Sequence, residues 1–223
     1  MASAPLLVLD LDGTLVDTIP DLTAALNRML AARGLSPLSL AEVRPMIGDG
    51  TKVLVKRALA ARGESDEPGT DAAYVADYTA HVAERSRAFP GIETTLASLR
   101  EEGWRFAVCT NKSAGATKAL LEVLGLAPWF CALGCGDSFA AKKPDPAHLG
   151  GTIALAGGSP ERTVMVGDHA NDIAAGQALG LPAIFAGWGY GPRSMAAVAA
   201  AVAERFSELA ELAPRVISAS LRA

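Results

Sequence analysis

Two aspartates near the start of the chain, Asp10 and Asp12, stand two positions apart at the end of an apolar run of leucine and valine. On an extended chain this spacing places both side chains on the same side. Burying two carboxylates together is costly, because desolvation and mutual repulsion both oppose ionisation, and a bound cation would remove that cost. Taken alone, the stretch is also compatible with a plain strand that ends in an Asp-Gly turn and a helix cap.

Further polar side chains follow later apolar runs. The carboxyl ends of parallel strands meet at one edge of a sheet, and ligands bind along that edge. We therefore expect these side chains to lie together with the first two aspartates. They are Thr110 with Asn111, Lys143, and Asp168 with Asp172, and each group except Lys143 directly follows a predicted strand.

The chemistry available to such a cluster is phosphoryl transfer. Asp10, Asp12 and Asp168 can supply oxygen ligands to Mg²⁺, which prefers oxygen and keeps positions for water and a substrate phosphate. A carboxylate can also act as a nucleophile and form an acyl-phosphate. Because phosphoryl transfer needs mainly positioning and charge neutralisation, the positive charge of Lys143 also suits it.

An α/β pattern supplies the elements that must position these residues. Apolar runs predict a strand from Leu6 to the first aspartate and further strands at 104–110, 130–134, 162–166 and 182–186. Helices are predicted at 92–102, at 114–124, within 144–155 and from residue 172. The alanine-rich tail, 194–221, is predicted to be helical with a break at Pro214. This order predicts an α/β fold with a doubly wound, Rossmann-like parallel sheet core, formed by residues 1–16 and 88–223.

Helical patterns alone fill the chain between these two parts of the core. The predicted helices begin near Asp17, at 39–45 with a capping box of Ser39 and Glu42, at 51–62 and at 71–87. Asp17, Thr18 and Asp21 are predicted to cap the first of them. Because this run interrupts the α/β alternation directly after the first strand, we predict an α-helical cap domain, residues 17–87, inserted into the core.

Composition narrows the class of protein. The chain has 223 residues, 50% of them hydrophobic, and a formal net charge of −4, which gives no electrostatic support to nucleic-acid binding. Its three cysteines are irregularly spaced, which favours reduced thiols over a disulfide framework. No apolar run is long enough to span a bilayer, and the first one lacks the basic start of a signal peptide. We expect a cytoplasmic monomer or homodimer that binds a small phosphorylated metabolite.

Together the motifs resemble those of the haloacid dehalogenase superfamily of phosphohydrolases. The family's first motif, Asp-x-Asp-x-Thr, matches residues 10–14, and its second, a strand-end Thr or Ser, matches Thr110. Its third, a lysine, matches Lys143, and its fourth, Gly-Asp-x-x-x-Asp, matches residues 167–172. All four occur in order over essentially the whole chain. Each is weak alone, whereas the set is specific.

The resemblance implies a Mg²⁺ cofactor and roles for the first two aspartates. Asp10 would be the nucleophile that forms an aspartyl-phosphate, and it would also bind the metal. Asp12 would donate a proton to the leaving oxygen, then activate water, and would bind the metal through its backbone carbonyl. The dehalogenases proper lack an acid at the position of Asp12, so the resemblance favours a phosphatase.

The other motif residues receive supporting roles from the same resemblance. The Thr110 hydroxyl and the Asn111 backbone N–H would hold the phosphoryl oxygens. Lys143 would neutralise charge on the phosphoryl group and the nucleophile. Asp168 would complete the metal site, and Asp172 would orient Lys143 or a bound water. Asn171, next to Asp172, would support these groups.

Within the predicted cap, residues 43–59 resemble the cap of bacterial phosphoglycolate phosphatases, as does the turn at 189–191. This resemblance favours 2-phosphoglycolate, a small carboxylated phosphoester, as the substrate. Gly48 and Gly50 flank a predicted helix start and can present backbone N–H groups to the substrate carboxylate. Arg44 or Lys52 can add a positive charge there.

Other functions stay open at this point. Asp49 and His169 depart from the pattern of that subfamily, so another small phosphomonoester, such as a sugar phosphate, is an alternative substrate. Phosphoglucomutase-like transfer is a further possibility, and phosphonate hydrolysis would require a cap lysine such as Lys52 to form a Schiff base. A different class is a catalytically silent binding or regulatory protein on the same fold.

Overall fold

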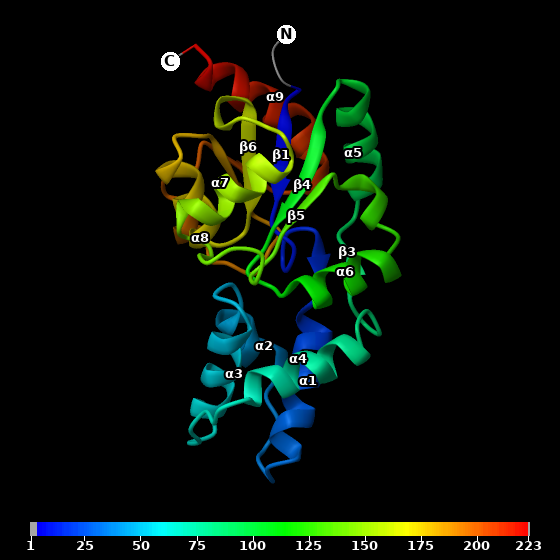
Figure 1. Cartoon of the computed structure of the whole chain (residues 1–223), viewed down its shortest axis with the longest axis vertical. Helices are drawn as coiled ribbons and strands as arrows, with labels where there is room; N and C mark the ends of the chain where they lie inside the picture. Colours follow the sequence, from blue (N-terminus) through cyan, green and yellow to red (C-terminus); the bar gives the residue numbers. More distant parts are fainter. Residues whose placement is uncertain (1–3, 223) are drawn as a thin grey trace.

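Six parallel strands form the sheet at the centre of the molecule, in the order β5-β4-β1-β6-β7-β8 (Figure 1). The computed structural model describes residues 4–222. The first strand, β1, lies in the middle because it is fully apolar and both faces are buried. The strands are β1 (Leu6–Leu9), β4 (Arg105–Cys109), β5 (Ala132–Gly134), β6 (Thr163–Gly167), β7 (Ala183–Ala186) and β8 (Ala201–Ala203).

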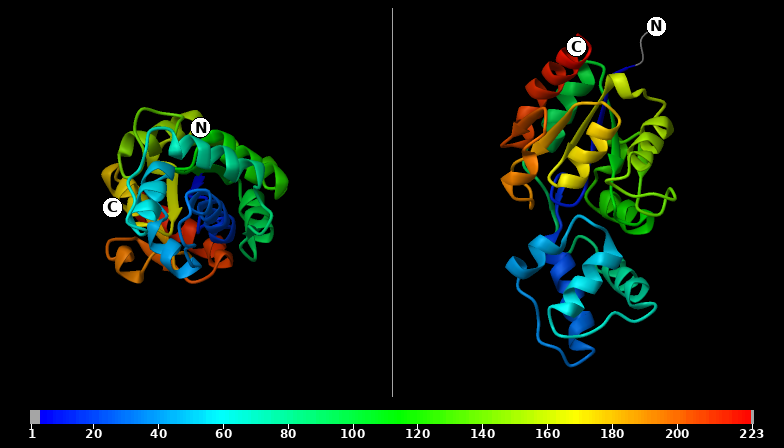
Figure 2. Two further views of the ribbon diagram at one scale, coloured as in Figure 1. Left: turned by 90° about the horizontal axis from the view of Figure 1, so that it is seen from below. Right: turned by 90° about the vertical axis from the view of Figure 1, so that its left-hand side faces the viewer.

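Helices cover both faces of this sheet, as Figures 1 and 2 show. Alternate residues of β1 point to opposite faces, so Leu7 and Leu9 join one hydrophobic cluster while Leu6 and Val8 join another. The first cluster includes α5 (Ile92–Glu101), α6 (Ala114–Val123) and α9 (Leu209–Ser220), and the second includes α7 (Pro146–Leu155) and α8 (Ala170–Ala178). The expected α/β fold with a doubly wound core is thereby confirmed.

A separate helical lobe lies beyond the carboxyl ends of the strands (Figures 1 and 2). It has its own apolar cluster, which includes Leu26, Val55 and Tyr74. Its helices are α1 (Ile19–Ala31), α2 (Leu40–Val43), α3 (Thr51–Ala60) and α4 (Thr70–Ala80), with a 3₁₀ turn at Arg44–Met46 after α2. The expected capping box of Ser39 and Glu42 is present at the start of α2.

The lobe joins the core through a short antiparallel ribbon. The two strands of this ribbon are β2 (Val16–Asp17) and β3 (Arg87–Ala88), and Val16 pairs with Ala88. This ribbon is where the chain leaves and re-enters the core, so we propose the boundaries of the helical cap, 17–87, at this place. None of the helices within residues 4–222 combines the length and apolar character needed to cross a bilayer.

The prediction of a helical tail was wrong in its first half. Residues 201–203 form β8, which pairs in parallel with β7 and buries Ala203 against the core. Sheet pairing at the edge of β7 therefore overrides the helix propensity of alanine. The break at Pro214 was also wrong, because α9 continues through it. The buried face of this helix, which includes Leu212 and Val216, outweighs the one backbone hydrogen bond that proline removes.

The predicted helix 71–87 was too long, and two residues predicted to cap the first helix make no side-chain cap bond there. Helix α4 ends at Ala80, and beyond it the backbone N–H groups of Arg85 and Ser86 donate to the buried Asp21 carboxylate. Asp21 thus holds the chain that leaves the cap instead of capping α1. Thr18 stands at the N-cap position of α1 but makes no side-chain cap bond there.

Candidate active site

Four charged side chains meet at the carboxyl end of the central strands. The Lys143 Nζ lies 2.9 Å from Asp10 Oδ1 and 2.6 Å from Asp172 Oδ1, and it also donates to the Cys109 carbonyl. Asp10 follows β1, Lys143 lies between β5 and α7, and Asp168 and Asp172 lie at and after the end of β6, so three parts of the chain contribute. All four side chains are buried. The sheet thus brings together groups that the sequence separates by more than a hundred positions.

Asp168 is fixed by two neighbours, one from the first motif and one from the loop after β7. The Thr14 hydroxyl donates to Asp168 Oδ1 at 3.1 Å, and the Tyr190 backbone N–H donates to Oδ2 at 2.7 Å. Gly13 has a φ of +86°, and a Cβ there would collide with the Asp168 carboxylate. The glycine of the first motif is therefore required both for its backbone conformation and for the space it leaves.

Burial and mutual repulsion perturb two of the carboxyls. Burial raises the pKa of Asp10 to about 6, although the positive charge of Lys143 opposes that rise. Burial, together with the negative charges of Asp10 and Asp172, raises the pKa of Asp168 to about 7. Lys143 stays protonated, because its attraction to these carboxylates outweighs the lowering of its pKa by burial.

This cluster is suited to a hard divalent cation. One carboxylate oxygen each from Asp10, Asp168 and Asp172 lies within 4.8 Å of the others. Oxygen donors without histidine or cysteine are typical of Mg²⁺ sites, and a cation would relieve the repulsion that raises the two pKa values. Asp10 and Asp168 were both expected as ligands. The Asp12 side chain lies outside this trio and has a different partner.

Asp12 pairs with Lys112, a residue that sequence analysis did not assign to the site. The Lys112 Nζ lies 3.0 Å from Asp12 Oδ1 and 3.3 Å from Oδ2. It also lies 4.2 Å from the centre of the Tyr78 ring, which the cap contributes from α4. Lys112 comes two positions after Thr110, directly beyond the second motif. That position next to a strand end was the signal that could have identified it.

Thr110 and Asn111 lie beside this pair, and both are buried. The Thr110 side-chain oxygen accepts the backbone N–H of Lys112 at 3.2 Å. The Asn111 side chain accepts the backbone N–H of Lys143 at 3.0 Å and donates to its carbonyl at 3.0 Å. Asn111 Nδ2 also donates to the Gly48 carbonyl at 3.0 Å, so this side chain links the second motif, the third motif and the cap.

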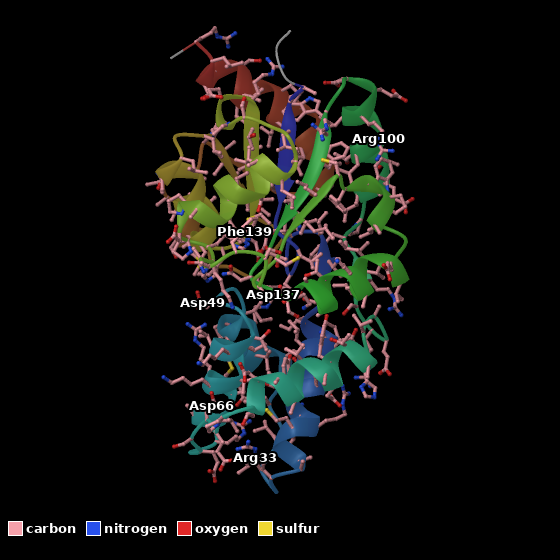
Figure 3. All side chains as sticks on the ribbon, viewed as in Figure 1. Arg33, Asp49, Asp66, Arg100, Asp137 and Phe139 are labelled. Atoms are coloured by element: carbon pink, nitrogen blue, oxygen red, sulfur yellow. The ribbon has the colours of Figure 1, made fainter. Side chains whose placement is uncertain are left out.

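A loop of the cap, residues 48–50, closes over these groups. A Cβ on Gly48 would lie 2.7 Å from the His169 ring, so glycine allows the loop to touch the core. Asn171 Nδ2 donates to Asp49 Oδ1 at 2.8 Å, and Asp49 also pairs with Arg57 at 2.6 Å. Figure 3 places Asp49 at the junction of cap and core. Its charge is thus neutralised on α3, which accounts for an acid at this position.

A cleft between cap and core, with a cavity volume of about 40 Å³, is bordered by Asp10, Asp12 and residues 110–112, but not by Lys143 or Asp168. Arg44 and Lys52 do not line this cleft, although both are exposed residues of the cap. The Arg44 guanidinium lies over the Tyr190 ring, 5.3 Å from its centre, and faces a second cavity of about 150 Å³. The residues that line the cleft are Asp10, Asp12, Leu22, Ile47, Gly48, Gly50, Thr51, Leu54, Thr110, Asn111 and Lys112.

Comparison with known proteins agrees with the fold and identifies the family. Residues 5–180 match the family model of haloacid dehalogenase-like hydrolases. A phosphoglycolate phosphatase of Agrobacterium fabrum is 44% identical over 192 residues, which cover 84% of this chain and 82% of that protein. One from Mesorhizobium japonicum is 41% identical over 224 residues, which cover 98% of this chain and 99% of that protein.

Solved structures of related proteins share the fold of this chain. A predicted phosphoglycolate phosphatase from Haemophilus somnus has a TM-score of 0.87 and 27% identity, covering 95% of this chain and 99% of that one. CbbY from Rhodobacter sphaeroides, solved in complex with phosphate, has a TM-score of 0.80 and 27% identity over 93% of this chain and 96% of that one. This chain belongs to the haloacid dehalogenase-like hydrolases.

Proposed function

We propose that this protein is a Mg²⁺-dependent phosphomonoester hydrolase that works through an aspartyl-phosphate on Asp10, with 2-phosphoglycolate as its substrate. The observation that carries the proposal is that Asp10, which lines the cleft between cap and core, is buried with Lys143 2.9 Å away and with Asp168 in the same cluster of carboxylates. The names of the relatives from Agrobacterium fabrum and Mesorhizobium japonicum support the choice of substrate.

In the first step, an oxygen of the Asp10 carboxylate attacks phosphorus. The bond from Asp10 to phosphorus forms, the ester bond breaks, and Asp12 gives its proton to the departing oxygen of glycolate. Lys143 is 2.9 Å from the nucleophile and offsets the negative charge that gathers around it. The Thr110 hydroxyl and the Asn111 N–H hold the phosphoryl oxygens.

In the second step, water hydrolyses the aspartyl-phosphate. Asp12 takes a proton from the attacking water, phosphate leaves, and the Asp10 carboxylate is restored. Asp10 and Asp168 would hold Mg²⁺, together with the Asp12 backbone carbonyl, and the ion would supply positive charge for the phosphoryl oxygens. Asp172 orients Lys143 through the 2.6 Å contact, and Asn171 fixes the cap loop above the site.

The cap loop supports recognition of a small substrate. Gly48 and Gly50 line the cleft, and helix α3 begins directly after Gly50 with its backbone N–H groups unpaired within the helix. A helix N-terminus favours an anion such as the substrate carboxylate. Arg44 and Lys52, which lie outside the cleft, are proposed to attract the anionic substrate to its entrance.

The cellular compartment and the binding partner are also part of this proposal. Its cysteines are free, two of them buried and Cys131 exposed, which favours a reducing compartment, and we therefore assign it to the cytoplasm. Its partner there would be a small phosphorylated metabolite, bound by a monomer or a homodimer. A sugar phosphate is the second candidate substrate, because a related structure, CbbY, was solved with xylulose-1,5-bisphosphate.

A phosphate-release assay tests this function. The panel contains 2-phosphoglycolate, glucose 6-phosphate, xylulose 1,5-bisphosphate and an aryl phosphate, each measured with Mg²⁺ and then with EDTA. We expect a kcat/KM for 2-phosphoglycolate that exceeds the others by at least about tenfold and is lost in EDTA. A preference for a sugar phosphate would overturn the choice of substrate. No release from any compound would favour a silent binding protein.

A further inference from the structure

The cleft contains a positive charge that the proposed chemistry does not use. Among the described residues that line it, Lys112 is the one cationic side chain, whereas Asp10 and Asp12 bring negative charge. Only 5% of the Lys112 side chain is exposed. Burying an ammonium is costly unless it is paired. Asp12 provides that pairing, and Lys112 also lines the cleft in which a substrate would lie.

Lys112 stays charged in this environment. Burial lowers the pKa of its ammonium, but the contacts with Asp12 and Tyr78 together outweigh burial, so the pKa lies above its ordinary value. Asp12 occupies one side of the ammonium at 3.0 Å, and the Tyr78 ring lies 4.2 Å away on the cap. An ammonium has three protons, so it can bind a second anion while it keeps Asp12.

The substrate itself carries an anionic group that fits beside Lys112. This inference rests on the proposed function, in which Asp10, Thr110 and Asn111 hold the phosphoryl group. The rest of the substrate then lies in the same cleft. The carboxylate of 2-phosphoglycolate would there face the negative charge of Asp12. Without a cation, the repulsion between two carboxylates would oppose binding.

We propose that Lys112 is the residue that selects a carboxylated substrate, by binding its carboxylate between the ammonium and the N-terminus of α3. Thr51, the first residue of α3, lines the same cleft as Lys112. The two features come from different domains and act in the same direction, because both attract an anion. Closing the cap places Tyr78 beside Lys112 and so keeps water away from this contact.

Arg44 is the rival cation, and its geometry is less suitable. Its side chain is exposed, it lies over the Tyr190 ring, and its Nη1 donates to the Gly189 carbonyl at 3.4 Å. It borders the second cavity, which Asp12 and Asp168 line but which neither the nucleophile Asp10 nor Thr110 lines. The carboxylate of a two-carbon substrate bound at Asp10 is therefore better placed for Lys112.

The test compares two substrates of similar size, 2-phosphoglycolate and 2-hydroxyethyl phosphate, which has a hydroxymethyl group in place of the carboxylate. The measured quantity is the ratio of their kcat/KM values. A general loss of catalysis, for instance through Asp12, lowers both values and cancels in the ratio. In K112M we expect the ratio to fall about ten- to a hundredfold, since a charge-assisted hydrogen bond is lost.

Two further variants keep the result interpretable. K112R retains the charge, so the ratio should stay within about threefold of the wild-type value. If K112M folds poorly, a K112R enzyme with a much lower ratio would still contradict the inference. K118M replaces an exposed lysine of α6, which follows the same loop, and should leave the ratio unchanged.

The outcomes separate this inference from the proposed function. If the wild type prefers 2-phosphoglycolate and K112M keeps that preference, the inference is wrong and the function stands. A fall of the ratio in R44M or K52M, with none in K112M, would place the carboxylate at the cleft entrance and also overturn it. If the wild type cleaves neither compound, or cleaves both equally well, the proposed function fails and the role of Lys112 fails with it.

Discussion

The Tyr190 hydroxyl donates a hydrogen bond to Asp17 at 2.8 Å and joins the catalytic core to the start of the cap. The same oxygen accepts the backbone N–H groups of Thr18 and Ile19, at 2.7 and 3.0 Å. The backbone N–H of Tyr190 binds Asp168 at 2.7 Å. One residue of the loop after β7 thus fixes a proposed metal ligand and the first turn of α1.

Removing the Tyr190 hydroxyl should therefore destabilise the protein. In Y190F two backbone donors and the Asp17 carboxylate lose their partner, which we expect to cost about 2 kcal/mol in the free energy of unfolding. Urea denaturation measures this loss. The control is Y74F, because the Tyr74 hydroxyl makes only a 3.3 Å bond to the Leu22 carbonyl. Equal effects of the two substitutions would show that the Tyr190 contacts contribute little.

Lys143 should be essential for both activity and stability. Replacing it by methionine leaves Asp10, Asp168 and Asp172 buried without their cation, which we expect to cost about 3 kcal/mol in a metal-free buffer. The same change should lower kcat/KM at least about a hundredfold, because the charge on the nucleophile is no longer offset. The exposed neighbour Lys142 provides the matched control, K142M. A K143M enzyme with near wild-type activity would rule out the proposed role.

The parts of the site that sequence predicts are those with a local signal. An apolar strand followed at once by Asp10 identifies a strand end, and the same pattern identifies Thr110 and Asp168. The doubly wound fold follows from the alternation of strands and helices, since parallel strands must bring their carboxyl ends together. The meeting of Lys143 with Asp10 then follows from the topology, even though no local pattern shows it.

Other contacts depend on long-range packing and leave no such signal. Lys112 follows a strand end, which places it near the site, but its partner Asp12 lies 100 positions away and nothing near either residue in the sequence shows that the two side chains pair. Tyr190 reaches Thr18 across 172 positions in the same way. The strand at 201–203 escaped prediction because its alanines have high helix propensity, and only the exposed edge of β7 selects the extended form.

His148 should make stability depend on pH. Its Nδ1 accepts the backbone N–H of Lys143 at 3.1 Å, and its Nε2 lies 3.1 Å from the Cys135 carbonyl, an arrangement that suits a neutral ring. Burial, and then the charge of Lys143, lower the pKa of His148 below its ordinary value of 6.5. The unfolded chain therefore takes up the proton first, so this contribution is complete above pH 6.5 and is lost as pH falls through the lower folded value.

The variant H148Q isolates this effect, because glutamine has no proton to gain in that range. The difference in unfolding free energy between wild type and H148Q should shrink between about pH 7.5 and about pH 5, measured by urea denaturation in EDTA. His169 and the carboxyl groups titrate in both proteins, so their contributions cancel in the difference. A difference that stays constant over this range would show that His148 does not titrate as described.

Mg²⁺ should stabilise the protein through the carboxylate cluster. A cation that binds the folded state alone raises the free energy of unfolding by about 2.7 kcal/mol at a concentration a hundred times its Kd. We therefore expect Tm to rise on adding Mg²⁺ to EDTA-treated protein. D168N should abolish the rise, whereas D71N, a change on α4 in the cap, should preserve it. An equal rise in D168N would place the ion elsewhere.

The most direct test of the account is to look for phosphoryl transfer to Asp10. The enzyme is mixed with radiolabelled 2-phosphoglycolate and Mg²⁺, quenched in acid within the first turnover, and digested for mass spectrometry. We predict a phosphorylated peptide that contains Asp10, and neither label nor phosphate release in D10N at an unchanged fold. A wild-type enzyme that turns over without labelling Asp10, or a D10N enzyme that retains full turnover, would contradict the proposed mechanism.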